Sequence, residues 1–337
     1  MRVLAEAPGR VNLIGDHTDY TGGLVFPMAI DRGTAVELER GVPWIELVSA
    51  DEEEPAFIVL ADPVEPSRVE PAWARYVAGV ATVLGVDTGG VGYVRTTLPI
   101  GAGLSSSAAL EVATALALGF AGPPLDLALA CQRAEQLASG VPCGIMDQLT
   151  SAAGVEGHAL LIDCSSLEVV PVPLPAGAEI VVVDSGQRRA LATSFYGVRR
   201  AQCEEAEVLV GPLRSATPAD VEGIAHDDLR RRARHVVTEN QRVRDFAEAF
   251  RAGDLRAAGS LMIESHRSLR DDFEVSTGVL DSLVESLVAA PGVFGARLTG
   301  AGFGGCVVAL CDAGAAASIG GWHVRASAGA SLTVLEP

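Results

Sequence analysis

Lysine is absent from the 337-residue chain, and all 25 of its basic residues are arginine. This absence excludes a phosphate loop of the G-x-x-x-x-G-K-[ST] type, and it excludes any mechanism that needs a catalytic lysine. Aromatic residues are also scarce, at 5% of the chain, so Ala, Val and Leu must form the core of a chain that is 49% hydrophobic. Its length is sufficient for two domains.

Cysteine pairs and long apolar runs are missing as well. None of the six cysteines forms a C-x-x-C motif, which argues against a zinc site and against a thiol–disulfide redox motif. We expect buried free thiols and therefore a cytoplasmic protein. The first ten residues do not have the pattern of a secretory signal, and no apolar stretch is long enough to span a bilayer.

Positive charge is in deficit, because 43 acidic residues give the chain a net charge of −18. Such a balance argues against nucleic acid and anionic membranes as partners. It does not argue against a nucleotide, since local arginines and a metal ion can overcome a distant net charge. No heptad pattern indicates a dimer, and we expect a monomer.

One glycine- and serine-rich segment stands out, Gly101-Ala102-Gly103-Leu104-Ser105-Ser106-Ser107. It leads directly into an Ala- and Leu-rich segment that predicts a helix over residues 108–119. The free N–H groups and the dipole at a helix start favour an anion such as phosphate. From this segment alone, a simple capped helix after a tight turn is an equally good interpretation.

Polar residues concentrate at two further places. Asp16, His17 and Asp19 lie among glycines after a predicted strand, an arrangement that can orient a polyhydroxylated ligand or form a surface turn. Asp147 is a lone acid in an apolar segment before a predicted helix. It is therefore a candidate helix cap, general base or metal ligand.

Other segments predict organisation rather than chemistry. Strands and helices alternate in both halves of the chain, which indicates an α+β or α/β fold. The proline-rich residues 170–175 predict a domain boundary. The cluster Arg230, Arg231, Arg232 and Arg234 predicts a solvated helix face. Residues 300–305 are glycine-rich but precede a strand, so they do not predict a dinucleotide site.

Five segments of the chain together carry a resemblance to a known family. Residues 8–20, with the sequence PGRVNLIGDHTDY, resemble the galactokinase signature, and residues 101–108 resemble the phosphate motif of the wider GHMP small-molecule kinases. Residues 298–306 resemble the C-terminal motif of the GHMP kinases. Residues 143–148 (CGIMDQ) and 265–276 are similar to galactokinases in particular. The order and spacing hold from residue 8 to about residue 310.

The resemblance implies an α+β fold of two domains with the active site in the cleft between them. Residues 1–170 would form a ribosomal-S5-like N-terminal domain, and residues 171–337 would form a ferredoxin-like C-terminal domain. It also implies transfer of the γ-phosphate of ATP to the C1 hydroxyl of α-D-galactose, with Mg²⁺ as cofactor.

The resemblance also assigns roles by position. Asp147 would be the catalytic base and Arg10 the transition-state stabiliser. Ser107 and Glu135 would hold Mg²⁺. The remaining residues divide into a sugar group, Asp16, His17, Thr18, Asp19, Gly144 and Tyr196, and a phosphate group, Gly101, Ala102, Gly103, Leu104, Ser105, Ser106 and Ser107.

One departure from the family pattern concerns Asp16, where galactokinases commonly have Glu. The shorter side chain retracts the carboxylate and leaves strictness toward galactose open. Two alternatives to a galactokinase therefore remain. One is a related sugar-1-kinase for N-acetylgalactosamine, arabinose or a uronic acid, and the other is a non-catalytic sugar sensor on the same fold.

Overall fold

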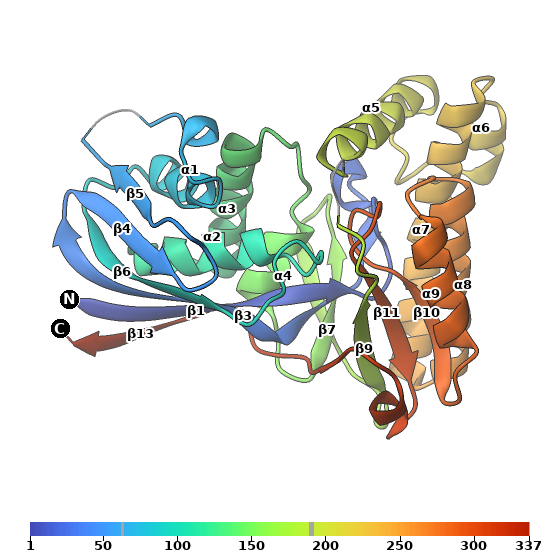
Figure 1. The fold of residues 1–337 in the computed structure, drawn as a ribbon. Helices are drawn as coiled ribbons and strands as arrows, with labels where there is room; N and C mark the ends of the chain where they lie inside the picture. The colour runs from blue at the N-terminus through green and yellow to red at the C-terminus, as the bar shows by residue number, and fades with distance from the viewer. Residues whose placement is uncertain (62–63, 189–191, 337) are drawn as a thin grey trace.

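A six-stranded sheet forms the first part of the molecule. The computed structural model describes residues 1–61, 64–188 and 192–336, and Figure 1 shows its two parts side by side. The strand order is β13-β1-β3-β6-β4-β5, and every pair is antiparallel except β4 with β6. The bounds are β1 (Arg2–Asn12), β3 (Pro27–Val42), β4 (Trp44–Ser49), β5 (Ala56–Val59), β6 (Gly89–Thr96) and β13 (Ser331–Glu336).

Four helices cover one face of this sheet (Figure 1). Small residues let them pack closely. A Cβ on Gly79 of α1 would lie 2.5 Å from the Ala134 carbonyl oxygen of α3. The core beneath the helices is rich in Ala and Val, as the scarcity of aromatic residues predicted. The helices are α1 (Ala74–Leu84), α2 (Ser106–Ala117), α3 (Pro124–Ser139) and α4 (Met146–Ala153), preceded by the 3₁₀ turn η2 (Pro66–Arg68).

The proline-rich residues 170–175, the predicted domain boundary, lie largely within a strand. Most of them belong to β8 (Glu168–Pro173), the edge strand of a three-stranded sheet with the order β2-β7-β8. The other strands are β2 (Leu24–Val25) and β7 (His158–Asp163). Proline is tolerated on an edge strand because its missing N–H can fall on the unpaired side. The predicted domain division after residue 170 falls within β8 and stays a prediction.

The second part contains a four-stranded antiparallel sheet and five helices (Figure 1). The sheet has the order β10-β11-β9-β12, with β9 (Glu179–Asp184), β10 (Val293–Leu298), β11 (Cys306–Cys311) and β12 (Trp322–Val324). The helices are α5 (Ala192–Val210), α6 (Pro218–Glu222), α7 (Asp227–Ala252), α8 (Leu255–Asp271) and α9 (Gly278–Val288). Two 3₁₀ turns complete the described elements, η1 (Asp19–Thr21) and η3 (Ala315–Ser318).

The arginine cluster of α7 is not a uniformly solvated face, and that prediction is wrong for Arg232. Its side chain is only 2% exposed and donates to Gln202, to the Asp272 carbonyl and to Glu274. Arg231 is more exposed and pairs with Asp228 and Glu274. Consecutive residues on a helix point in different directions. One arginine of a consecutive run on a packed helix therefore faces the neighbouring elements and not the solvent.

The two parts share one core and one sheet. Phe26 of the segment before β3 packs edge-on against Phe246 and Phe250 of α7. The last strand, β13, returns to the first sheet, where it pairs with β1. The two parts are therefore held together by apolar packing and by the path of the chain itself. No helix of the described ranges is both long and apolar enough to cross a membrane.

Candidate active site

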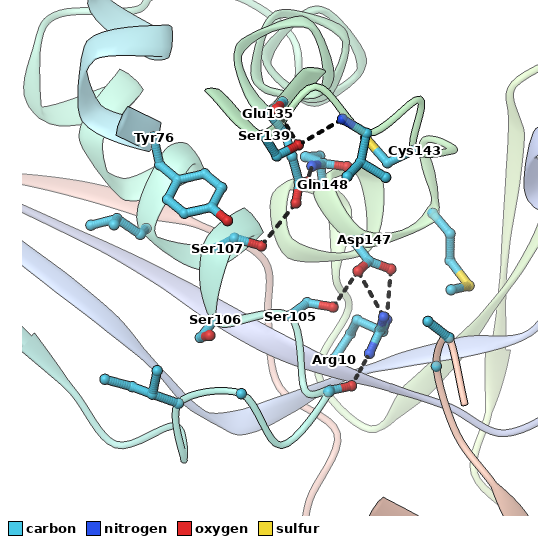
Figure 2. Close-up of a pocket in the computed structure, with 18 of the residues that line it drawn as sticks. Arg10, Tyr76, Ser105, Ser106, Ser107, Glu135, Ser139, Cys143, Asp147 and Gln148 are labelled. Carbon is cyan, nitrogen blue, oxygen red and sulfur yellow. Dashed lines mark hydrogen bonds and ion pairs between the residues drawn. The ribbon is translucent and has the colours of Figure 1, made fainter. Parts of the chain in front are cut away.

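A cleft of about 510 Å³ lies where the two parts meet. Its walls come from β1, from the 101–107 loop at the start of α2, from α3 and α4, from α5 and from the turn before β11. Figure 2 shows its central residues, with Arg10 and Asp147 at the middle. Segments that are far apart in the sequence thus converge on one site, as the resemblance implied.

Arg10 and Asp147 form a two-pronged ion pair in this cleft. Arg10 Nε donates to Asp147 Oδ1 at 2.8 Å, and Nη2 donates to Oδ2 at 2.7 Å. The third donor, Nη1, reaches the Gly103 carbonyl at 2.7 Å. The Arg10 side chain is almost fully buried, whereas that of Asp147 is 28% exposed to the cleft. The arginine is fixed, and the carboxylate has a face open to a ligand.

The 101–107 loop turns through three residues with positive φ. Gly101 and Gly103 adopt this conformation easily, whereas Ser105, at φ +60°, is an uncommon non-glycine case. Its hydroxyl donates to Asp147 Oδ2 at 2.5 Å, so Ser105 serves the acid rather than an open phosphate position. Side chains of Ala102 and Leu104 do not line the cleft. The Leu104 carbonyl instead accepts from the Arg10 backbone N–H.

The structure also brings together Ser107 and Glu135. Ser107 Oγ donates to Glu135 Oε1 at 3.1 Å, and Gln148 Nε2 donates to Glu135 Oε2 (Figure 2). The same Gln148 nitrogen donates to Glu111 of α2 at 3.1 Å. Burial, followed by the charge on Asp147, raises the pKa of Glu135 to about 7. A cation at this position would relieve the crowding of negative charge.

His17 is held neutral between two partners. Its Nε2 lies 3.2 Å from the Ala301 carbonyl, which can only accept, so Nε2 carries the proton. Nδ1 then accepts from the Tyr20 hydroxyl at 3.0 Å. Burial and the nearby His235 lower the pKa of His17 to about 3. The ring is therefore uncharged at neutral pH and contacts Tyr196, with 5.6 Å between ring centroids.

Two of the predicted sugar residues are not free in the structure. Thr18 is fully buried, and its hydroxyl contacts the Gly15 and Leu24 carbonyls, so the side chain does not reach the cleft. Asp16 reaches the cleft wall but is 2% exposed and paired with Arg297. Both residues support the shape of the 15–23 loop.

Asp19, Gly144 and Tyr196 do line the cleft together. A Cβ on Gly144 would lie 1.9 Å from Asp19 Oδ2, so only glycine allows this approach of the two segments. Burial, followed by the charge on Asp147, raises the pKa of Asp19 to about 7. The charge on Asp147 thus opposes the charges of both Asp19 and Glu135 in the cleft.

The raised pKa of Asp19 predicts a pH-dependent cost to stability. Between its unfolded value near 3.8 and its folded value near 7, the native state binds a proton that the unfolded state has released. Stability is therefore lost as pH rises through this window. We expect Asp19→Asn to raise the free energy of unfolding of the unliganded protein by on the order of 2 kcal/mol at pH 8, and hardly at pH 4.

Urea unfolding at the two pH values measures this difference. An equal effect of Asp19→Asn at pH 4 and pH 8 would contradict the raised pKa.

One end of the cleft was not predicted from the sequence. Beyond Ser106 and Ser107, the cleft continues into a lobe lined by Trp73, Tyr76, Leu110, Val94 and Thr96. Two aromatic residues one helical turn apart, in a chain so poor in aromatics, were a usable signal. Arg188 was also missed. It reaches the 101–107 loop from the second part and donates from Nη1 to the Ile100 carbonyl at 3.1 Å.

Comparison with protein-family models defines the class of protein first. The GHMP kinase N-terminal domain model matches residues 75–155, and the GHMP kinase C-terminal model matches residues 246–320. The two parts together therefore have the α+β, two-domain fold of the GHMP kinases, as predicted, and the chain is an ATP-dependent kinase of this class. The galactokinase galactose-binding signature matches residues 2–40.

Individual relatives narrow the assignment. Galactokinase of Chloroflexus aurantiacus is 46% identical over 96% of this chain and 88% of its own length, and human galactokinase is 46% identical over 92% and 84%. The crystal structure of Lactococcus lactis galactokinase complexed with galactose matches with a TM-score of 0.91 and 31% identity, over 98% of this chain and 95% of that chain. The chain belongs to the galactokinase family.

Proposed function

We propose that this galactokinase transfers the γ-phosphate of ATP to the C1 hydroxyl of α-D-galactose, giving galactose 1-phosphate and ADP. The observation that carries the proposal is the Arg10–Asp147 pair, open on the Asp147 side and adjacent to the 101–107 loop. It places a proton acceptor and a fixed cation where a sugar hydroxyl and a phosphate would meet.

Asp147 orients the sugar hydroxyl and accepts its proton. The C1 oxygen attacks the γ-phosphorus, the bond to the β-phosphate oxygen breaks, and the hydroxyl proton passes to the carboxylate. Because Arg10 and Ser105 already donate to the two oxygens of Asp147, the proton moves late, in a loose transition state. Arg10 lies beside the transferring group, where its charge opposes the negative charge on the phosphoryl oxygens.

Phosphate binding needs no lysine in this chain. The backbone N–H groups of the 101–107 loop and the start of α2 provide donors and the positive end of a helix dipole. Arg188 adds a guanidinium beside the same loop. These groups position the phosphates in line with the acceptor hydroxyl.

Ser107 and Glu135 fit a magnesium ion. Both present oxygen ligands, 3.1 Å apart, beside the phosphate loop, and Mg²⁺ in nucleotide sites usually takes one or two protein oxygens, with phosphates and water completing its shell. No cluster of three or more His, Cys, Asp or Glu side chains suited to a metal occurs among the described residues, which agrees with a site completed by the substrate. Bound there, Mg²⁺ would neutralise charge on the β- and γ-phosphates.

The sugar would occupy the end of the cleft between Asp147 and the 15–23 loop. Asp19, the neutral His17 ring and Tyr196 line this end, together with the Gly144 backbone. Carboxylate, imidazole and phenol groups supply donors and acceptors for several hydroxyls at once.

Replacing Gly144 tests the sugar end directly. Since the new Cβ would collide with Asp19 Oδ2, we expect Gly144→Ala to raise KM for galactose by roughly 10- to 100-fold, with little change in KM for ATP. Gly278→Ala is the matched control, because no atom lies within 4 Å of its added Cβ at the start of α9. Equal galactose KM values for the two variants would place the sugar elsewhere.

The lobe lined by Trp73 and Tyr76 would hold the adenine base, because a flat aromatic base suits a slot of aromatic and aliphatic side chains. We expect Trp73→Ala to raise KM for ATP by roughly 10-fold and to leave KM for galactose within about two-fold. Tyr93→Ala is the control, since that ring is 62% exposed on β6. A rise in the galactose KM instead would contradict this placement of the base.

Release of ADP over a panel of sugars tests the function as a whole. The purified protein is assayed with ATP, Mg²⁺ and galactose, N-acetylgalactosamine, arabinose or galacturonic acid. Turnover that is best with galactose supports the proposal. A different best sugar would indicate a related sugar-1-kinase, and sugar binding without ADP release would indicate a sensor.

The last part of the proposal concerns the cellular compartment and the oligomeric state. All six cysteines are free thiols, which fits a reducing compartment, and we place the enzyme in the cytoplasm as a monomer. Size-exclusion chromatography with light scattering checks the oligomeric state.

A further inference from the structure

The carboxylate of Asp16 is already occupied within the protein. Oδ2 accepts from Arg297 Nη2 at 2.6 Å, and Oδ1 accepts from the Gly300 backbone N–H at 3.1 Å. Asp16 belongs to the segment after β1, whereas both of its donors belong to the second part of the molecule. The acid that the resemblance assigned to the sugar therefore links two distant segments.

Arg297, on β10, is a fully buried guanidinium. Besides Asp16, it donates from Nη1 to the Asn12 carbonyl at 3.4 Å, at the end of β1. Removing two charges from water is costly, and apolar residues of similar size often replace a buried ion pair without loss of stability. A contribution to stability alone does not explain the Asp16–Arg297 pair. Its position, between the 15–23 loop and β10, does.

Other buried contacts fix the same loop from the same side. Glu239 of α7 is fully buried and accepts from the Gly15 N–H at 3.0 Å. His235, one helical turn earlier, lies with Nε2 3.1 Å from the Asp16 carbonyl. His17 in turn contacts the Ala301 carbonyl. The backbone before His17 and Asp19 is thus held by α7, β10 and the turn after β10.

We propose that Asp16 is a positioning residue and not a sugar ligand, and that its ion pair with Arg297 sets galactose affinity by holding the 15–23 loop against the turn formed by residues 299–301. This inference rests on the proposed galactokinase function. A direct ligand would lose its contact with one hydroxyl when replaced. A positioning residue would weaken binding of every sugar that the loop contacts.

The test combines a double-mutant cycle with a series of sugars. Asp16→Asn, Arg297→Gln and the double variant are assayed with galactose and with each monodeoxygalactose that the wild-type enzyme still uses. We expect each single variant to raise KM for galactose by roughly 10-fold, and the double variant to be no worse than the worse single one. The fold increase should be the same for every sugar, with KM for ATP within about two-fold of wild type.

Two results would overturn the proposal. The effects of the single variants could multiply in the double variant, or the Asp16→Asn effect could vanish for one deoxygalactose, which would identify Asp16 as a ligand of that hydroxyl. Failure of the proposed function is a separate outcome, because it would show as wild-type enzyme that does not turn over galactose.

Misfolding needs its own control, since either single variant leaves a buried charge unpaired. Asp16→Leu with Arg297→Met removes both charges and replaces them with apolar side chains of similar volume. We expect this variant to unfold at a temperature near that of the wild type and yet to bind galactose roughly 10-fold more weakly by calorimetry without ATP. Wild-type affinity in this folded variant would contradict the proposal. Glu65→Gln, which opens an exposed ion pair with Arg68, should leave affinity unchanged.

Discussion

Asp147→Asn is expected to lower kcat by about 10²- to 10⁴-fold, the range that a positioned acid–base group contributes. The amide retains the size of the carboxylate but cannot accept the hydroxyl proton. It also leaves Arg10 without its carboxylate partner and changes the bond to Ser105. We expect KM for galactose to change much less than kcat, because Asp147 accepts the hydroxyl proton in the transition state and not in the bound ground state.

Single-turnover phosphate transfer measures this effect most directly. Asp126→Asn is the matched control, since Asp126 occupies the first turn of α3, as Asp147 occupies the first turn of α4, but is exposed. Near-wild-type kcat for Asp147→Asn would show that another group removes the proton.

Arg10→Lys is expected to lower kcat by roughly 10²- to 10³-fold although the positive charge is kept. Arg10 uses three nitrogens in two directions, two toward Asp147 and one toward the Gly103 carbonyl. A single ammonium on a flexible stem cannot keep both the acid and the 101–107 loop in place. The loss therefore measures geometry and not charge.

Steady-state kinetics of Arg10→Lys and of Arg2→Lys separate the two contributions. Arg2 lies on the same strand and forms an exposed ion pair with Glu37, so its replacement should have little effect on kcat. If Arg10→Lys were as active as Arg2→Lys, charge alone would account for the role of Arg10.

Much of the site could be predicted because its chemistry lies in short segments. The glycine turn into α2, the polar 15–23 loop and Asp147 are each visible locally, and the family motifs joined them. The contact between Arg10 and Asp147, which are 137 positions apart, follows from the motifs and from no local pattern.

The remaining features depend on what packs against each segment. Thr18 has the same polarity as its neighbours, but its hydroxyl turns inward to two carbonyls. Arg232 is one of several arginines in a row, and only its contacts with Gln202 and Glu274 make it buried. The prolines of β8 did not suggest a strand, because the sequence does not show that this segment lies at a sheet edge.

The return of β13 to β1 has a consequence for biosynthesis. Until Ser331–Glu336 have been made, the outer side of β1 is an open strand edge, available for pairing with other nascent chains. The first sheet is therefore completed by a strand that is made after the helices and strands of the second part, although its other strands are made early. A chain interrupted before β13 leaves the Arg2–Glu6 edge of β1 unpaired and is therefore prone to aggregate.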